Sequence, residues 1–145
     1  MRRTEYLTEK REFHKIPVTL LMEREVKSCL ASDTGRHVAL QLTQFNIGSL
    51  PVVDDKGLLV GFVTEFDLLD ILLKDKELKD VRAEEIMTRD VKSVREDTPV
   101  DEVIRLLEND HLIRVPVVKD GKLVGIVARR DILFGYIKST ADYWP

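Results

Sequence analysis

Cysteine is nearly absent from this chain of 145 residues, which contains a single one, Cys29. One cysteine cannot form an intrachain disulfide, and this fits a reducing compartment. Cys29 lies in a strand-like run at residues 26–30. We therefore interpret it as a buried structural thiol and not as a reactive one.

Long apolar segments are also missing from the sequence. No apolar run approaches the ~18 residues that a membrane span needs. The N-terminus has charged residues where a signal peptide would have an apolar stretch. These two absences predict a cytoplasmic protein that does not enter a membrane.

The motifs of common catalytic sites are absent as well. We find no nucleophile next to a base, no phosphate-binding Walker loop and no G-x-G-x-x-G motif. The three histidines, His14, His37 and His111, are scattered and do not have the spacing of metal ligands. His111 is interpreted as a helix-end residue. The sequence therefore predicts no enzyme, no catalytic residue and no metal site.

Neither sign of charge is in large excess, with a net charge of −3 and an isoelectric point near 5.7. Proteins that follow a phosphate backbone usually have a basic excess or a basic stripe, so nucleic acid is a disfavoured partner. Hydrophobic residues make up 43% of the chain. This is enough to form a core and too much for a disordered chain.

One pattern occurs twice in the chain. The sequences LPVVD and GFVTEFDLL at residues 50–54 and 61–69 correspond to VPVVK and GIVARRDIL at residues 115–119 and 125–133. A repeat of this length takes precedence over local propensity in assigning a fold. Each copy of roughly 60 residues would bury little surface alone. We therefore expect the two copies to pack on each other.

Within each copy the pattern predicts the order β-α-β-β-α. In the second copy Thr98 is a suitable N-cap for the first helix, with Pro99 at its first position. In the first copy either Asp33 or Thr34 is the cap. Turn residues between apolar runs predict a hairpin, and a final helix closes each copy. The predicted fold class is α/β (α+β), with two repeats related by pseudo-twofold symmetry.

The repeat also divides the chain into segments. These are an N-terminal arm at 1–15, a first repeat at 16–75, a charged linker at 76–80, a second repeat at 81–138 and a tail at 139–145. The tail ends in Tyr143, Trp144 and Pro145. Its two aromatic residues suggest docking onto a surface, such as that of a partner subunit.

With these motifs, residues 16–138 resemble a tandem pair of CBS domains, a unit named after cystathionine β-synthase and often called a Bateman module. The resemblance implies a regulatory module that binds AMP, ADP, ATP or S-adenosylmethionine in the crevice between its repeats. It also implies a homodimer, and a separately encoded enzyme or transporter that responds to it. No cofactor is required beyond the regulatory ligand.

The resemblance further implies particular site residues. In the family, the aspartate that ends the motif G-h-h-T-x-x-D contacts ribose hydroxyls, and the hydroxyl residue three positions earlier helps to hold phosphate. Asp67 and Thr64 match both positions, whereas Asp131 is accompanied by Ala128. Further pocket residues are Val26, Lys27, Ser28, Ile47, Gly48, Ser49, Pro51, Lys92, Ser93, Val94, Leu112, Ile113, Arg114 and Pro116. Which of them serves which site is left open.

A local explanation competes with the ligand for Thr64 and Asp67, because a threonine followed three residues later by an acid forms a capping box. Ala128 has no hydroxyl to cap with, so this explanation is not expected to cover the second copy. Arg129 and Arg130 also lie in the first helical turn, where the helix dipole disfavours cations. A bound phosphate would relieve this conflict. The alternative is that both side chains point to solvent or to a dimer partner.

Arg114 lies in an otherwise apolar strand, so it is either a phosphate ligand at the pocket mouth or a residue of an exposed edge. The sequence is also compatible with two other functions. Ala128 favours a dimerisation scaffold with a degenerate pocket, and the arginines leave room for nucleic-acid binding, which the acidic net charge disfavours.

Overall fold

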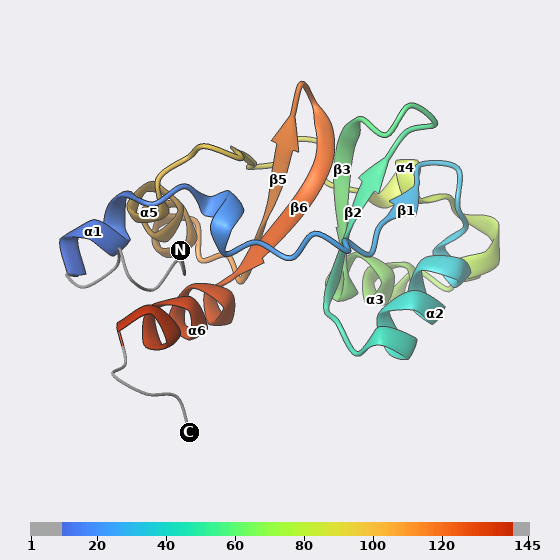
Figure 1. Ribbon diagram of the computed structural model, residues 1–145. Coiled ribbons are helices and arrows are strands. Elements are labelled where there is room, and N and C mark those ends of the chain that lie inside the picture. Colours follow the sequence, from blue (N-terminus) through green and yellow to red (C-terminus); the bar gives the residue numbers. More distant parts are fainter. Residues whose placement is uncertain (1–9, 141–145) are drawn as a thin grey trace. The chain divides into compact units, whose positions relative to one another are not determined.

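A computed structural model describes residues 10–140, which form two compact units (Figure 1). Of the described residues, unit 1 contains those up to Val26, together with residues 92–119 and those from Val124 onward. Unit 2 contains residues 27–91 and 120–123. Most of the predicted N-terminal arm, and Tyr143 and Trp144 of the tail, lie outside the described residues.

Unit 2 is built on a three-stranded sheet in the order β1-β2-β3. Strand β1 is parallel to β2, and β2 is antiparallel to β3. The elements of this unit are β1 (Cys29–Leu30), α2 (Gly35–Phe45), β2 (Ser49–Val53), β3 (Leu59–Thr64), α3 (Glu65–Leu73), η3 (Leu78–Asp80) and α4 (Ala83–Ile86).

Unit 1 repeats this topology with the sheet order β4-β5-β6, in which β4 is parallel to β5. Its elements are α1 (Lys10–Lys15), η2 (Val18–Leu20), β4 (Val94–Arg95), α5 (Val100–Asn109), β5 (Arg114–Lys119), β6 (Lys122–Ala128) and α6 (Arg129–Thr140). The β5–β6 turn has positive φ at both Asp120 and Gly121. This is the geometry of a tight two-residue hairpin. The α/β class and the two β-α-β-β-α repeats are confirmed.

The helix starts follow local hydrogen bonding, with one correction. Thr34 caps α2, because its hydroxyl accepts from the His37 N–H at 3.1 Å. The prediction that Thr98 caps the other helix is wrong, since Pro99 is the N-cap and α5 begins at Val100. The buried Thr98 hydroxyl instead accepts from the Arg95 N–H at 3.0 Å. The Thr98 hydroxyl oxygen thus stabilises the turn before α5 and does not accept from an amide in the first turn of the helix.

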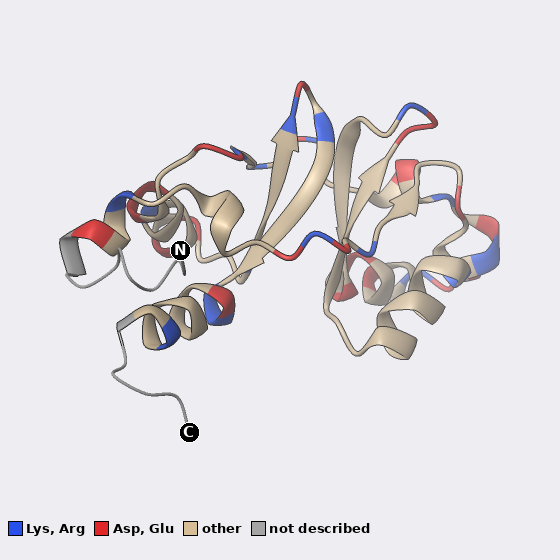
Figure 2. Cartoon of the chain, in the orientation of Figure 1, with Lys and Arg blue, Asp and Glu red and all other residues tan. Residues whose placement is uncertain are grey.

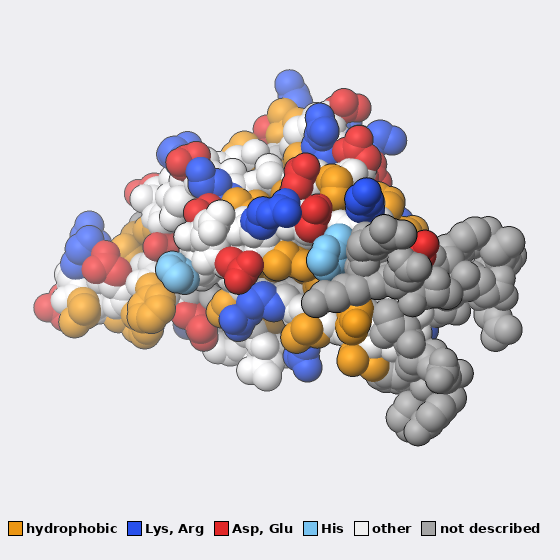
Figure 3. Space-filling model, turned by 90° about the vertical axis from the view of Figure 1, so that its left-hand side faces the viewer, with side chains coloured by type: hydrophobic (Ala, Val, Ile, Leu, Met, Phe, Trp, Pro, Cys, Tyr) orange, Lys and Arg blue, Asp and Glu red, His pale blue; other side chains and the backbone are white. Residues whose placement is uncertain are grey.

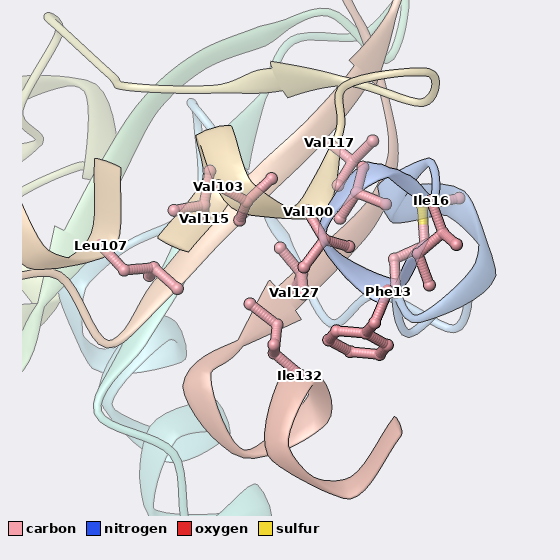
Figure 4. Packing of buried hydrophobic residues seen from close by; sticks show 11 residues of the cluster. Phe13, Ile16, Val100, Val103, Leu107, Val115, Val117, Val127 and Ile132 are labelled. Carbon is pink, nitrogen blue, oxygen red and sulfur yellow. The ribbon is translucent and has the colours of Figure 1, made fainter. Parts of the chain in front are cut away.

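The core of unit 1 combines residues far apart in the sequence (Figure 4). Phe13 and Ile16 pack with Val100, Val127 and Ile132. Backbone hydrogen bonds attach the same segment, with Val18 N–H donating to the Thr98 carbonyl at 2.8 Å. The segment that opens the first sequence repeat therefore packs on the sheet of the second.

Unit 2 shows the reciprocal arrangement. Ala83 is fully buried in the core with Val38 and Leu50, and Met87 packs against that cluster. Thr88 and Phe62 exchange backbone hydrogen bonds of 2.9 and 3.0 Å. The opening segments of the two repeats are thus exchanged between the packing units. The predicted boundaries at 16–75 and 81–138 divide the sequence, and as domain boundaries they stay a prediction.

Cys29 is 3% exposed in the core of unit 2. Its burial, with a smaller contribution from the negative charge of Asp33, raises the pKa of the thiol to about 12. This agrees with its interpretation as a buried structural thiol. None of the helices within residues 10–140 is both long and apolar enough to span a membrane.

Candidate functional site

The predicted binding residues of each copy gather at one end of that copy's sheet. Strand β2 is antiparallel to β3, so it starts where β3 ends. Strand β1 is parallel to β2 and begins at Cys29, opposite Val52, so the residues before β1 extend toward the same end of the sheet. Lys27 and Ser28 precede β1, Ser49 begins β2, and Thr64 ends β3. Ser49 and Thr64 are register partners. The same topology places Ser93, Arg114 and Ala128 at the equivalent end in unit 1.

In the first copy Asp67 is held against the start of α3. Its carboxylate accepts from the Thr64 N–H at 2.8 Å and from the Thr64 hydroxyl at 3.2 Å. The same hydroxyl accepts from the Asp67 N–H at 3.3 Å. The predicted capping box is therefore formed. It fixes the carboxylate at the sheet end and commits the threonine hydroxyl to local bonds.

The second copy keeps half of this arrangement. The Asp131 carboxylate accepts from the Ala128 N–H at 2.8 Å, the same length as the Thr64 bond. We expected no helix-capping interaction in the second copy, because Ala128 has no hydroxyl. This expectation is wrong for the Asp131 carboxylate, because its hydrogen bond needs only the backbone amide of Ala128. Both aspartates lie in matching positions at the start of a closing helix.

Arg114 lies beside this second carboxylate. It begins β5, is half-buried, and interacts electrostatically with Asp131. Burial lowers the pKa of its guanidinium, and the charge of Asp131 opposes that shift. The Arg129 N–H donates to the Ile113 carbonyl at 3.1 Å, which ties the start of α6 to the start of β5. Arg129 and Arg130 are both exposed at the start of α6, where Figure 2 shows basic and acidic residues together.

The other predicted wall residues separate into buried and surface positions. Pro51 and Pro116 are fully buried within strands, so they support the sheet and are not available as pocket surface. Ile47 packs on the core of unit 2, and Leu112 and Val94 pack on the core of unit 1.

The surface positions have different surroundings. The Lys27 ammonium lies 4.5 Å from the centre of the Phe45 ring, and the Ser28 carbonyl accepts from the Gln41 amide at 3.4 Å. Val26 is half-buried, whereas Gly48, Lys92 and Ser93 are exposed. Ile113 is 62% exposed.

A cavity of about 600 Å³ lies within unit 1, between α5 and α6. Of the predicted site residues only Leu112 and Arg129 line it. The sequence interpretation assigned none of the other lining residues to a site, although it left open that His111 lies near the second crevice. These residues are Ile104, Leu107, Glu108, His111, Ile132 and Leu133. The 104, 107, 108 and 111 positions have helical spacing and could have indicated a shared face. Within the described residues, no group of three His, Cys, Asp or Glu side chains could hold a metal ion.

Comparison with known proteins agrees with this topology. A model of the CBS domain matches residues 18–74 and 83–138. The chain belongs to the CBS domain family, as a tandem pair of such domains.

Curated relatives differ in length. The chain is 37% identical over 113 residues to the uncharacterized protein YlbB of Bacillus subtilis, which covers 77% of this chain and 76% of that protein. It is 38% identical over 127 residues to the L-aspartate semialdehyde sulfurtransferase of Methanocaldococcus jannaschii, which covers 83% of this chain and 24% of that enzyme. Similar CBS pairs thus occur in short proteins and as parts of enzymes.

Solved structures include pairs with bound adenosyl compounds. One is CBSX2 in complex with AMP, with a TM-score of 0.78 and 27% identity over 87% of this chain and 99% of that one. Another is the CBS domain pair of MJ0100 with 5′-methylthioadenosine and S-adenosylmethionine. It has a TM-score of 0.72 and 34% identity, and covers 83% of this chain and 98% of that chain.

Proposed function

We propose that this chain is a regulatory module that binds adenosine-containing ligands at the sheet ends that bear Asp67 and Asp131. The observation that carries the proposal is the matched pair of carboxylates, each fixed by a 2.8 Å hydrogen bond from a backbone amide. An ionised carboxylate has about four acceptor positions, so each retains capacity for ribose hydroxyls. The adenosyl ligands of CBSX2 and MJ0100 support this choice of ligand class.

Regulation follows from differential binding. A ligand shifts a conformational equilibrium only by the difference in its affinity for the two states. We infer that ligand binding changes the arrangement of the two repeats, and that a separately encoded enzyme or transporter responds to that arrangement. Regulation of this kind needs no catalytic residue in this chain.

The exposed apolar residues support a homodimer. Phe66, Leu69 and Leu73 on α3 are 82%, 53% and 84% exposed, and Leu133 and Phe134 on α6 are 67% and 54% exposed. Apolar surface of this kind usually marks an interaction site. A second copy of the chain could cover such a helix through a symmetric interface.

The dimerisation scaffold without a ligand is the second candidate, and the same apolar surface favours it. Figure 3 shows acidic and basic side chains interspersed on one face, which is unlike the basic stripe of a nucleic-acid-binding protein.

Calorimetric titration with AMP, ADP, ATP and S-adenosylmethionine tests the proposal. We expect saturable binding, weakened by about 1.5–3 kcal/mol in Asp67→Ala or Asp131→Ala at the site that the residue serves, because a charge-assisted hydrogen bond is lost. Asp70→Ala is the matched control, since Asp70 is on α3, more than half exposed and paired with Lys74. Failure of all four ligands to bind would favour the scaffold, and unchanged binding in both variants would reject the site.

A further inference from the structure

The two sheet ends share a backbone geometry but differ in charge. The Glu65 N–H donates to the Gly48 carbonyl at 3.0 Å, and the Arg129 N–H donates to the Ile113 carbonyl at 3.1 Å. These bonds, and the hydrogen bonds that Asp67 and Asp131 accept from the Thr64 and Ala128 amides, occur at equivalent positions in the two copies. Any difference in ligand preference between them must therefore come from the side chains.

The first copy presents acidic and neutral groups. Glu65 and Asp67 occupy the first turn of α3, and Phe66 lies between them. Gly48 leaves room for the Glu65 side chain, since a methyl group added at Gly48 would lie 3.0 Å from the Glu65 Oε1 atom. A carboxylate therefore lies beside the start of β2. The Thr64 hydroxyl, which could otherwise meet a phosphate, is engaged with Asp67.

The second copy presents basic groups at the same places. Arg129 and Arg130 replace Glu65 and Phe66, and Arg114 replaces Ser49. Lys27 and Lys92 occupy equivalent positions before β1 and β4, so they do not contribute to the difference. Without the lysines, the first end has two negative charges and no positive one. The second has three positive charges and the negative charge of Asp131.

This difference changes the electrostatic energy of a phosphate. A phosphate dianion beside Glu65 and Asp67 meets like charges and a hydroxyl that is already bonded. Beside the arginines it meets guanidinium groups, which form strong hydrogen bonds with phosphate oxygens. A nucleoside without phosphate avoids the repulsion at the first end and still offers a ribose diol to Asp67.

We propose that the two sites select ligands by charge, so that the Asp131 site takes a phosphorylated nucleoside and the Asp67 site takes an uncharged or cationic one. This inference rests on the proposed function, because it assumes that both sheet ends bind nucleosides. It assigns each site its own ligand class and makes the module responsive to two ligands at once.

Calorimetry of the intact chain of 145 residues with AMP and with 5′-methylthioadenosine tests the inference, since the two share an adenosine and differ in charge. We expect the two compounds to bind together without competition. Asp131→Asn should lower the affinity for AMP about tenfold and leave the affinity for 5′-methylthioadenosine unchanged. Asp67→Asn should lower the affinity for 5′-methylthioadenosine about tenfold and leave the affinity for AMP unchanged. Raising the salt concentration should lower the affinity for AMP and leave the affinity for 5′-methylthioadenosine unchanged.

Charge variants sharpen the test. Arg130→Gln should lower AMP affinity about tenfold and leave 5′-methylthioadenosine unchanged. Lys138→Gln is the control, since it makes the same charge change on α6 but lies eight residues further along the helix. Glu65→Gln should raise AMP affinity at the first site, so that a second equivalent of AMP binds per chain.

The outcomes separate the two claims. Binding of both compounds with mutual competition, or equal loss of both in Arg130→Gln, would overturn charge selection and leave the proposed function standing. If neither compound binds while ADP, ATP or S-adenosylmethionine does, charge selection is likewise overturned and the proposed function stands. If none of these adenosine-containing compounds binds to the folded chain, the proposed function fails and the inference fails with it.

Discussion

Asp67 and Asp131 each accept a hydrogen bond from a backbone amide at a helix start, so each contributes to folding as well as to the proposed binding. Asp67 also bonds the Thr64 hydroxyl, which has no counterpart at Ala128. Asp67→Ala should therefore lower the free energy of unfolding by about 0.5–2 kcal/mol, and Asp131→Ala by less. Urea denaturation measures both values. The idea fails if Asp67→Ala is no more destabilising than the surface control Asp70→Ala.

Cys29 gives a pH prediction with a definite sign. Its pKa is about 12 in the folded chain and about 8.5 in an unfolded one. Because burial favours the protonated thiol, its contribution to stability is complete below the unfolded value and is lost as the pH rises toward 12. The unfolding free energy should fall over this range more steeply in the wild type than in Cys29→Ala. Equal slopes in urea denaturation from pH 8.5 to 11 would contradict the burial of this thiol.

At this scale the sequence predicted the capping box of Thr64 and Asp67, because a cap depends on neighbours three residues apart. It did not predict that Asp131 accepts a hydrogen bond from the Ala128 amide. The alanine lacks the hydroxyl of a capping box, and we therefore expected no cap in the second copy. Thr98 was assigned as a cap because its residue type and its position before Pro99 fitted. In the structure the Thr98 hydroxyl accepts a hydrogen bond from the Arg95 N–H. This bond belongs to the turn before the helix, and no sequence motif indicates it.

Among the secondary-structure elements, the exchanged opening segments depend on two close methionine–glycine contacts. A methyl group added at Gly125 would lie 2.5 Å from the Met22 sulfur, and one added at Gly61 would approach the Met87 sulfur more closely still. In both cases the methionine and the glycine belong to different sequence repeats. Glycine is needed on each strand so that the thioether can lie flat against it.

This contact predicts an interaction between residues of the two repeats. Gly61→Ala should lower the free energy of unfolding by about 1–3 kcal/mol, because overpacking forces the Met87 side chain or the strand to move. In Met87→Ala, the added cost of Gly61→Ala should be smaller, because the clash is gone. Thermal or urea denaturation of the four proteins in this cycle gives the coupling energy. Simple additivity would contradict the packing of Met87 on β3.

The order and type of the elements could be predicted because hydrophobic periodicity and turn residues are local signals. The sequence could not predict which of the two sheets each opening segment packs on. The two sheets have nearly the same pattern of apolar residues, so the segments 16–22 and 81–87 fit either sheet by composition. The choice is made by long-range contacts such as that of Val18 with Thr98.

For the whole molecule, the exchange means that neither sequence repeat contains a complete packing unit. A fragment of residues 1–78 lacks Ala83 and Met87 of the unit 2 core, and a fragment of residues 79–145 lacks Phe13, Ile16 and Val18 of the unit 1 core. Each fragment alone should show less structure and melt at a lower temperature than the intact chain. An equimolar mixture should regain much of the lost signal, as followed by circular dichroism. Two fragments that fold fully alone and ignore each other would contradict the interleaved architecture.

The family resemblance supplied the ligand class and the motif positions, which composition and spacing alone could not provide. The sequence also placed the basic residues of the second copy. The position of the Glu65 carboxylate over Gly48 required the structure, because a side-chain direction at a helix start is not encoded in a linear motif.

Binding of a nucleotide at the Asp131 site can be seen in a crystal structure of this chain in complex with AMP. We expect the ribose hydroxyls within hydrogen-bond distance of the Asp131 carboxylate and the phosphate next to an arginine at the start of α6 or β5. AMP bound elsewhere, such as in the cavity between α5 and α6 and away from the Asp131 carboxylate, would contradict it.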